Sequence, residues 1–287
     1  MKQYEDFKKR FKLLIQKNKK LIINTLSNIF SMRAIGNKTH GDLAEIGIAE
    51  FINQFMYDYR SEHVGKALFR AKEYEEDILI INELTKEEFP ISLKAYGKGP
   101  LQLSTDSDNK MFPFLQKLPK DIKSRKTIQT IFNSEPFSDF DSINILPLIY
   151  DEANKKCNIM VFDYEKAKEK TARILFIDKN KKFDFENNTI VSQKGRKHPI
   201  FMFLDNEENY ICEVRYGGAS DNALQRGLWT HSVNAAFYFD SITDGWIDYS
   251  HNETLVKLFR LALNATCEGH IKANKILQQD IDRIKEC

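Results

Sequence analysis

Two short apolar segments separated by a charged turn constrain the fold of this chain more than any other part of its 287 residues. Residues 77–83 (DILIINE) and 89–96 (FPISLKAY) are both typical of strands, and the residues between them, LTKEE, are polar enough for a turn. The sequence therefore predicts a β-hairpin. The second segment carries a lysine, Lys94, and a lysine in a buried strand is rare unless it is paired.

Alternation along the second strand separates its polar and apolar side chains. Ser92 and Lys94 share one face, whereas Ile91 and Leu93 point the other way, into a core. Asp77 opens the first strand, and a hairpin brings the start of one strand near the end of the next. We therefore expect Asp77 and Lys94 to lie close together. The alternative is a strand-edge lysine that reaches water and an acid that caps a turn.

A helix upstream of the hairpin offers a second carboxylate. Residues 42–58 have apolar side chains at helical spacing, after a segment with two glycines (31–41, SMRAIGNKTHG). Glu45 lies near the start of this helix, and Glu50, five residues on, points to a different face. If the helix lies beside the hairpin, Glu45 adds a second oxygen ligand. The alternative is an ordinary exposed glutamate.

Two carboxylates and a lysine suit the metal-dependent hydrolysis of a phosphodiester. Magnesium prefers oxygen ligands. A bound cation polarises the scissile phosphate and lowers the pKa of a bound water, and a nearby lysine orients that water or stabilises the developing negative charge. We therefore expect Asp77 and Glu45 to hold Mg²⁺, with Lys94 assisting the water and Ser92 beside them.

These residues resemble the catalytic core of type II restriction endonucleases, which belong to the PD-(D/E)XK nuclease superfamily. In that family a helix carries an acid, one strand starts with the metal-binding aspartate, and the next strand carries (D/E)-x-K. The helix after Gly36-Asn37, the strand that Asp77 opens and the segment 91–106 (ISLKAYGKGPLQLSTD) follow this order. By this resemblance Glu45 corresponds to the helix acid, Asp77 to the metal-binding aspartate and Lys94 to the motif lysine.

The chain departs from the family motif at two positions. Glu76 stands where the motif has proline, and Ser92 stands where it has an acid. Ser92 cannot be an ionised ligand, so the metal has one carboxylate fewer. Either Glu76 or Glu45 compensates, or the Ser92 hydroxyl contributes a contact or holds a water. The resemblance covers about residues 33–106.

The resemblance implies an α/β (α+β) fold, with a mixed central sheet flanked by helices and an additional strand-rich half that reads DNA. It implies cleavage of both strands of double-stranded DNA at a short site. A homodimer is expected because symmetric sites are usually cut by dimers, with the N- or C-terminal helix as candidate interface. A cognate DNA methyltransferase would act on the same site without stable binding to this chain.

Two stretches suit contacts to DNA. Residues 97–100 (GKGP) would form a tight loop that places Lys98 at a phosphate, followed by Gln102 and Ser104 on one strand face. Residues 212–232 (CEVRYGGASDNALQRGLWTHS) combine glycines with the amide and guanidinium groups that read base edges, and similar segments occur in restriction enzymes that cut four-base sites. A polar surface loop is the alternative. The residues expected to contact DNA are Lys98, Gln102, Ser104, Lys194, Arg196, Lys197, Arg215, Tyr216, Gly217, Gly218, Ser220, Asp221, Asn222, Gln225 and Arg226.

The remaining pattern predicts one domain without internal repeats. We divide it into an N-terminal helical segment (1–35), a catalytic core (36–135), a strand-rich recognition part (136–250) and a C-terminal helix (251–287). Helices are expected at 3–30 and 253–285, and the first is expected to pack on a core rather than on a membrane. Residues 106–135 have a weak helical signal. Further strands are expected at 64–71, 101–104, 145–150, 158–163, 172–178, 200–204, 210–216 and 235–239.

Composition excludes several classes of protein. Net charge is only +2, so a uniformly basic nucleic-acid coat is not indicated, although residues 8–20, 117–126 and 194–197 are locally basic. No apolar run approaches the roughly 18 residues that span a bilayer, and the charged N-terminus does not resemble a signal peptide. We expect a soluble protein of the bacterial cytoplasm that binds no membrane, with its four cysteines as free thiols.

Two other functions remain open. One is a repair or junction-resolving nuclease of the same superfamily, which acts on DNA structure rather than sequence. The other is a non-catalytic DNA-binding protein on a degenerate nuclease fold, which Ser92 favours. A nucleotide-binding enzyme is disfavoured, because neither a P-loop motif nor a G-x-G-x-x-G motif is present.

Overall fold

The computed structural model describes most of the first 257 residues and isolated positions beyond them. The described residues are 2–20, 40–63, 77–97, 100–106, 108–141, 144–151, 153–184, 186–187, 189–192, 198–216, 226–251, 253, 256–257, 275, 279 and 282. The chain divides into two compact units. Unit 1 comprises Met1–Lys98, Asn144–Val161 and Ser241–Cys287, and unit 2 comprises Gly99–Ile143 and Phe162–Asp240.

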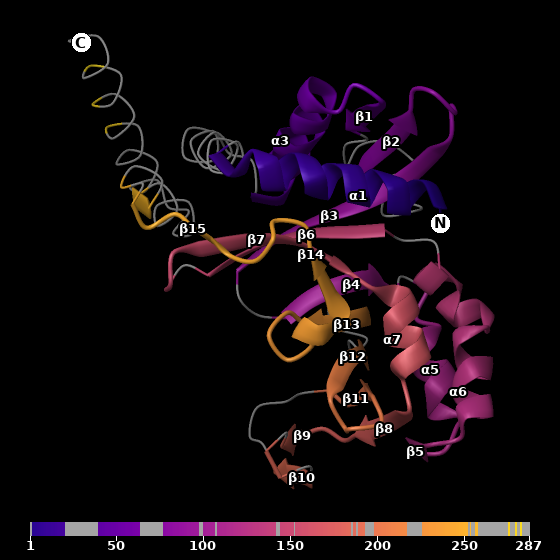
Figure 1. Ribbon diagram of the computed structural model, residues 1–287. Coiled ribbons are helices and arrows are strands. Elements are labelled where there is room, and N and C mark those ends of the chain that lie inside the picture. The colour runs from indigo at the N-terminus through magenta and orange to yellow at the C-terminus, as the bar shows by residue number, and fades with distance from the viewer. Residues whose placement is uncertain are drawn as a thin grey trace. The chain divides into compact units, whose positions relative to one another are not determined.

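Unit 1 contains a mixed sheet with helices against one face (Figure 1). The helices are α1 (Lys2–Lys17) and α3 (His40–Phe55). The sheet has the order β1-β2-β3-β6-β7-β14, and β15 also pairs with β7. Its strands are β1 (Tyr59–His63), β2 (Ile78–Asn82), β3 (Glu88–Gly97), β6 (Asn144–Asp151), β7 (Lys156–Phe162), β14 (Phe239–Ser241) and β15 (Ile247–Asp248). The last residue of β7 and the first two of β14 are counted in unit 2.

The helix α1 supplies an aromatic stripe to the core of unit 1. Tyr4, Phe7, Phe11 and Ile15 recur at helical spacing and are all buried, whereas most of the other positions carry charged side chains. The ring of Phe7 lies 5.6 Å from that of Phe89 on β3. The N-terminal helix therefore packs on a core, as the spacing of its apolar residues predicted.

The predicted hairpin is present. β2 pairs with β3 in antiparallel register, with Ile78 opposite Ile91 and Ile80 opposite Phe89. On its other side β3 pairs in parallel with β6, so Ser92 lies opposite Ile145. The strand β2 (ILIIN) is buried on both faces. Its sequence is therefore a run of isoleucine and leucine rather than an alternation of apolar and polar residues.

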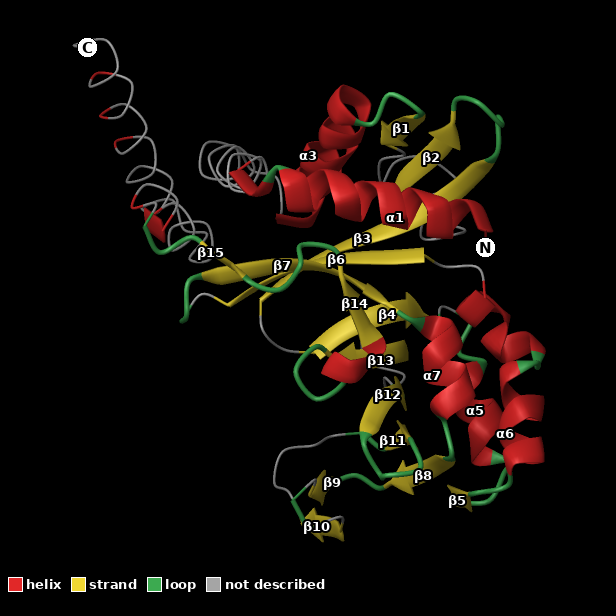
Figure 2. Cartoon of the chain, in the orientation of Figure 1, coloured by secondary structure: helices red, strands yellow, loops and turns green. Residues whose placement is uncertain are grey.

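Unit 2 contains an antiparallel sheet in the order β4-β13-β12-β11-β8-β5 (Figure 2). Its strands are β4 (Pro100–Thr105), β13 (Gly227–His231), β12 (Tyr210–Arg215), β11 (Ile200–Leu204), β8 (Arg173–Ile177) and β5 (Asp121–Ile122). A separate ribbon pairs β9 (Lys181–Asp184) with β10 (Thr189–Ser192). The helical elements are α5 (Met111–Gln116), α6 (Arg125–Phe132), η1 (Glu135–Asp141), α7 (Tyr164–Lys170) and η3 (Ala236–Tyr238).

Aromatic side chains form much of the core of unit 2. Phe112 on α5 lies 5.1 Å from Phe201 on β11, and Phe132 on α6 lies 5.8 Å from Phe203 on the same strand. The two side chains on β11 are fully buried. The weak helical signal of residues 106–135 thus corresponds to two short helices that place phenylalanines against the sheet.

Several sequence-based boundaries are wrong. Residues 235–239 form the short helix η3 and only then the strand β14, because Tyr238 turns inward and donates its hydroxyl to Asp205. The strand β1 was not expected, since YRSEH is polar, and the expected strand 64–71 lies outside the described residues. The elements α7, β9, β10 and β13 were also missed. Most of the expected helix 253–285 lies outside the described residues.

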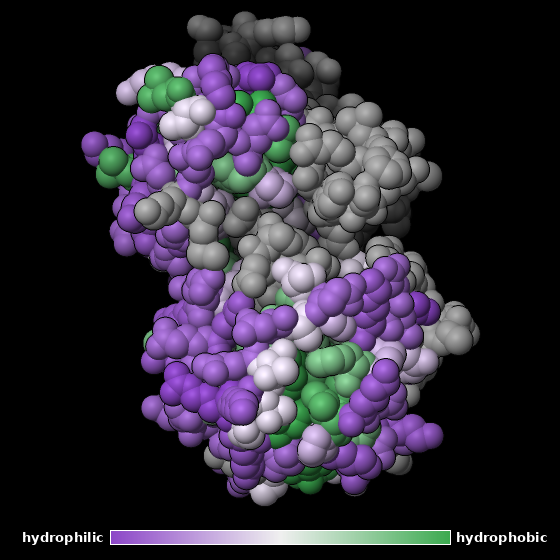
Figure 3. All heavy atoms as spheres, turned by 90° about the vertical axis from the view of Figure 1, so that its right-hand side faces the viewer, coloured by the Kyte–Doolittle hydropathy of each residue, from purple (hydrophilic) through white to green (hydrophobic). Residues whose placement is uncertain are grey.

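The molecule is a mixed α+β protein whose units interrupt each other along the chain. The boundaries expected at residues 36, 136 and 251 do not coincide with those of the two units. The described surface that faces the viewer in Figure 3 is mostly hydrophilic. Among the described residues, no helix is long and apolar enough to cross a membrane.

Candidate active site

Asp77 lies where β2 and β3 separate, and its carboxylate occupies the fork between them. Its Oδ2 accepts a hydrogen bond from the Ser92 hydroxyl at 3.0 Å and another from the Leu93 amide at 2.7 Å. The Asp77 amide donates to the carbonyl oxygen of Ile91 at 3.2 Å. The carboxylate therefore takes the place that a further residue of β2 would have taken in the ladder.

Beyond this fork, β3 continues without β2. The ladder between the two strands begins at Ile78 opposite Ile91, whereas β3 runs on to Gly97 beside β6. Ser92 is buried and Lys94 is half-buried, and alternation places both on one face. The structure thus brings Asp77 and Ser92 into contact and puts Lys94 two residues further along the same face.

Contacts between α3 and β1 locate Glu45 along the sheet. The Ser61 hydroxyl donates to the carbonyl oxygen of Ala49 at 2.7 Å. Because α3 leads into β1 through a short turn, the two elements run in opposite directions. Residues earlier in α3 therefore lie beside residues later in β1. One turn before Ala49, Glu45 lies about 6 Å back along the axis, which equals the rise of about two strand residues. Glu45 is therefore level with His63, the partner of Ile78.

From this register we expect Glu45 near the end of β2 that Asp77 precedes. Glu45 is 4% exposed and shares a helical stripe with Ile48 and Ile52, which face the sheet. Helix α3 covers the face that carries Ile91, opposite to the face of Lys94. Glu45 thus approaches the open end of β2 from the helix side. The interpretation of Glu45 as an exposed glutamate is wrong, whereas Glu50 is exposed as its different face predicted.

The oxygen donors at this end of β2 fit a hard divalent cation. Asp77 Oδ1 has no hydrogen bond to a described residue, so it is open to a ligand. Magnesium binds proteins through one or two carboxylates and keeps several waters, so Asp77 alone, or Asp77 together with Glu45, could supply its protein ligands. No group of three histidine, cysteine or acidic side chains that could hold a metal occurs among the described residues. Glu76 lies outside them.

The two residues expected after the hairpin to contact DNA are engaged within unit 2. Gln102 on β4 donates through Nε2 to the carbonyl oxygen of Arg226 at 3.1 Å. Ser104 is 3% exposed, so its expected contact with DNA is incompatible with its position in the sheet. Gln102, on the same face of β4, is only half-buried, so alternation alone did not reveal that Ser104 is enclosed.

The expected recognition segment forms the connection of a β-hairpin. Arg215 ends β12 and pairs with Gly227, the first residue of β13. Tyr216 packs its ring 5.0 Å from Phe112, and Arg226 precedes β13. Trp229 is 8% exposed and packs in the sheet. The other expected DNA contacts lie outside the described residues, and they are Lys98, Lys194, Arg196, Lys197, Gly217, Gly218, Ser220, Asp221, Asn222 and Gln225.

Sequence reasoning missed the support behind Arg215. Its Nε donates to Glu213 Oε1 at 2.6 Å, and its guanidinium carbon lies 4.2 Å from the centre of the Trp229 ring. Glu213 and Trp229 are direct cross-strand partners. The sequence did contain a signal for the ion pair between Glu213 and Arg215. The two charged residues lie two positions apart in a predicted strand, and such residues share a face.

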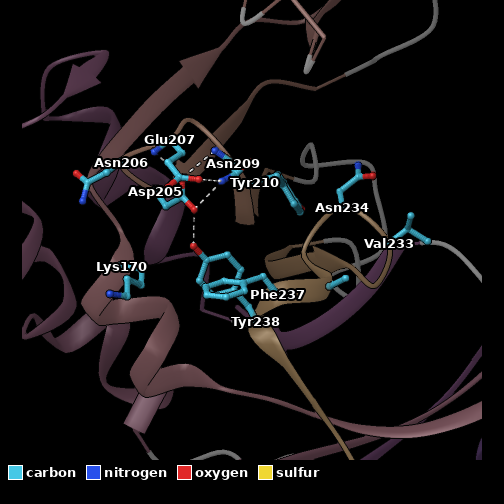
Figure 4. Close-up of a pocket in the computed structure, with 11 residues that line it drawn as sticks. Lys170, Asp205, Asn206, Glu207, Asn209, Tyr210, Val233, Asn234, Phe237 and Tyr238 are labelled. Carbon is cyan, nitrogen blue, oxygen red and sulfur yellow. Dashed lines mark hydrogen bonds between the residues drawn. The ribbon is translucent and has the colours of Figure 1, made fainter. Parts of the chain in front are cut away.

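A cavity of about 540 Å³ in unit 2 contains none of the expected site residues (Figure 4). At its wall, Asp205 accepts hydrogen bonds from the amides of Glu207 and Asn209, both at 2.8 Å, and from the Tyr238 hydroxyl at 2.8 Å. Burial raises the pKa of Asp205, but these hydrogen bonds together outweigh burial and hold the pKa below its ordinary value. The carboxylate thus fixes a turn and is already satisfied.

The two described cysteines are inert. Cys157 and Cys212 are free and buried. Burial raises the pKa of Cys157 to about 12 and that of Cys212 well above its ordinary value. Both side chains are therefore neutral thiols at physiological pH, in agreement with the expectation of free thiols, while Cys267 and Cys287 lie outside the described residues.

No protein-family model, curated protein or solved structure matches this chain.

Proposed function

We propose that this protein is a magnesium-dependent endonuclease of the type II restriction class, which hydrolyses double-stranded DNA at a short specific site. The observation that carries the proposal is the Asp77 carboxylate in the fork of β2 and β3, hydrogen-bonded to Ser92 and followed on the same face by Lys94. The resemblance of these residues to the PD-(D/E)XK motif and the register that brings Glu45 to the same strand end support it.

Each residue has a distinct role in this proposal. Asp77 and Glu45 hold Mg²⁺, which when bound polarises the scissile phosphate and lowers the pKa of a water. Ser92 donates to Asp77 and so orients the carboxylate, leaving Oδ1 for the cation. Lys94 orients the attacking water and stabilises the negative charge that develops on the phosphate. A cognate methyltransferase that modifies the same site would protect host DNA.

A lysine substitution tests the catalytic assignment. We expect Lys94→Ala to abolish cleavage of unmethylated phage DNA in the presence of Mg²⁺, by at least about 100-fold, while specific DNA binding survives. The matched control is Lys86→Ala, because Lys86 lies in the turn of the same hairpin and is exposed. Cleavage is measured by gel electrophoresis and end-sequencing, and binding by electrophoretic mobility shift. Undiminished cleavage by Lys94→Ala removes the catalytic role.

The same digestion separates this function from its closest rival. A restriction enzyme yields discrete fragments from a plasmid, whereas a junction or repair nuclease acts on DNA structure and yields no fixed bands from linear duplex. Cleavage of four-way or flap DNA, with intact duplex left uncut, would assign the protein to the second class.

One observation favours a protein that binds DNA without cutting it. Ser92 occupies the position of the second motif acid and spends its hydroxyl on Asp77. Among the described residues, Asp77 belongs to no group of three acidic, histidine or cysteine side chains that could hold a metal. If the site is degenerate, the wild-type protein binds duplex DNA equally with and without Mg²⁺ and leaves it uncut. Magnesium-dependent cleavage by the wild type excludes this alternative.

A further inference from the structure

Arg215 is held in one orientation by two neighbours within the sheet of unit 2. Its Nε is bound to the carboxylate of Glu213, which is 5% exposed, and its guanidinium lies against the ring of Trp229, which is 8% exposed. A buried carboxylate and a buried indole are rigid supports, so Arg215 loses little conformational freedom when it binds a ligand. The Arg215 side chain itself remains 28% exposed.

The backbone that carries Arg215 is also anchored. Arg215 and Gly227 form the last pair of the β12–β13 hairpin, so the connection 216–226 begins and ends there. The carbonyl oxygen of Arg226 accepts hydrogen bonds from Gln102 Nε2 at 3.1 Å and from the Asp106 amide at 3.3 Å. Arg215 thus lies on an anchored strand end, directly before the segment expected to read DNA.

The chemistry of this arrangement favours a base edge over a phosphate. A guanidinium has five N–H donors, and Glu213 uses the one on Nε, which leaves the four on the two terminal nitrogens. Two parallel donors match O6 and N7 of guanine in the major groove. A phosphate contact depends mainly on net positive charge, and the Glu213 carboxylate 2.6 Å away neutralises that charge locally.

We propose that Arg215 determines sequence specificity by reading guanine, so the recognition site contains at least one G·C pair contacted by this side chain. The inference rests on the proposed function, because it names the base that the nuclease reads. It assigns Glu213 and Trp229 as positioning residues, which hold the guanidinium and do not touch DNA.

The test combines a side-chain change with a change of one base atom. The recognition site is first defined by end-sequencing of wild-type digests. Each guanine in a duplex with that site is then replaced by 7-deazaguanine, which lacks the N7 acceptor. We expect the wild-type protein to lose about 10-fold to 100-fold in cleavage efficiency at one such position. Arg215→Ala should be slow on both duplexes and insensitive to that replacement.

Two further variants separate specificity from stability and charge. Arg215→Lys keeps the charge but lacks the planar pair of donors and the Nε contact with Glu213, so it should weaken the preference for guanine. The control is Arg173→Lys. Arg173 lies on β8 of the same sheet and, like Arg215, forms ion pairs within it, in this case with Asp121 and Glu208. This variant should retain the wild-type base preference and sensitivity to 7-deazaguanine, even if it unfolds at a lower temperature.

The outcomes distinguish this inference from the proposed function. A recognition site without G·C pairs, or an Arg215→Ala variant that responds to 7-deazaguanine as the wild type does, overturns the role of Arg215 and leaves the nuclease assignment intact. A variant that changes only the salt dependence of binding identifies Arg215 as a phosphate contact and also overturns the role. Wild-type protein that neither binds nor cleaves DNA overturns both proposals.

Discussion

At the scale of single residues, a carboxylate can serve structure or chemistry, and the number of donors around it separates the two. Asp77 receives two hydrogen bonds on one oxygen, and its other oxygen has none from a described residue. Asp205 receives hydrogen bonds on both oxygens, from backbone amides and from the side chains of Asn209 and Tyr238. The first can accept a cation, whereas the second closes a turn.

Asp205 provides a prediction of pH dependence. Burial raises the pKa of Asp205, but the hydrogen bonds from Asn209, Tyr238 and Glu207 together lower the pKa by more than burial raises it. The folded-state pKa therefore lies below the unfolded value of about 3.9. The stability that Asp205 contributes is therefore complete above about pH 4 to 5 and is lost as the pH falls through the folded-state pKa. We expect Asp205→Asn to lower the free energy of unfolding at pH 7 by roughly 1–3 kcal/mol.

Urea denaturation at pH 7 and at pH 3 checks this expectation. The difference between wild type and Asp205→Asn should shrink at pH 3, because below the unfolded-state pKa the unfolded carboxyl takes up a proton more readily than the folded carboxylate does. Glu186→Gln is the control, since Glu186 lies in an exposed turn. A difference that stays constant between the two pH values would show that the carboxylate charge of Asp205 contributes nothing.

At the scale of elements, the β12–β13 hairpin depends on a close approach of two backbones. Gly227 has φ +117°, a conformation that side chains disfavour. A Cβ added there would overlap the carbonyl oxygen of Ser104 and lie 2.7 Å from the Asp106 nitrogen. The pairing of β13 with β4 therefore requires glycine at this position, and Ser104 is buried by the same approach.

A glycine substitution tests this requirement. We expect Gly227→Ala to lower the free energy of unfolding by about 3 kcal/mol or more, because steric overlap with β4 adds to backbone strain. Gly245→Ala is the matched control, since Gly245 also has positive φ (+88°) but a Cβ there meets nothing within 4 Å. It should cost only about 1 kcal/mol. Equal losses in thermal or urea denaturation would mean that strain alone, and not contact with β4, requires Gly227.

At the scale of the whole molecule, the two units are interleaved along the chain. Unit 1 draws on three segments and unit 2 on two, so neither is a continuous stretch that a sequence boundary would delimit. The N-terminal helix belongs to unit 1. Its apolar side chains, among them Phe7 and Phe11, pack in the core of that unit. These side chains are therefore not free to form the dimer interface expected for the N-terminal helix.

Oligomeric state gives a prediction at this scale. If each chain cuts one strand of a symmetric site, we expect a homodimer in solution or on DNA. Sedimentation equilibrium should give twice the mass of one chain without DNA, or that mass plus the mass of one duplex when a duplex that carries the cleaved site is present. The control is a duplex of equal length without that site. A single chain bound to DNA, releasing nicked rather than broken duplexes, would contradict the expectation.

The hairpin of residues 77–96 and the face shared by Ser92 and Lys94 were predictable, because apolar patterning and strand alternation are local properties. Asp77 was expected to lie close to Lys94, and the hydrogen bond that its side chain accepts from β3 comes from Ser92. The helix that bears Glu45 followed from the same kind of periodicity. The strand β1 was not predictable, because its polar sequence YRSEH becomes a strand through pairing with β2. The segment 235–239 failed for a similar reason, since a hydrogen bond from Tyr238 to distant Asp205 outweighs its local strand propensity.

The sequence by itself determined the short-range parts of this protein: the amphipathic helices, the β2–β3 hairpin and the set of polar side chains on one face of β3. These follow from residue spacing, which repeats with the period of each element. Only the tertiary structure decided that Glu45 is buried, that Ser104 is enclosed, and that Glu213 and Trp229 hold Arg215. Each of these depends on contacts between residues distant in sequence, which no local period encodes.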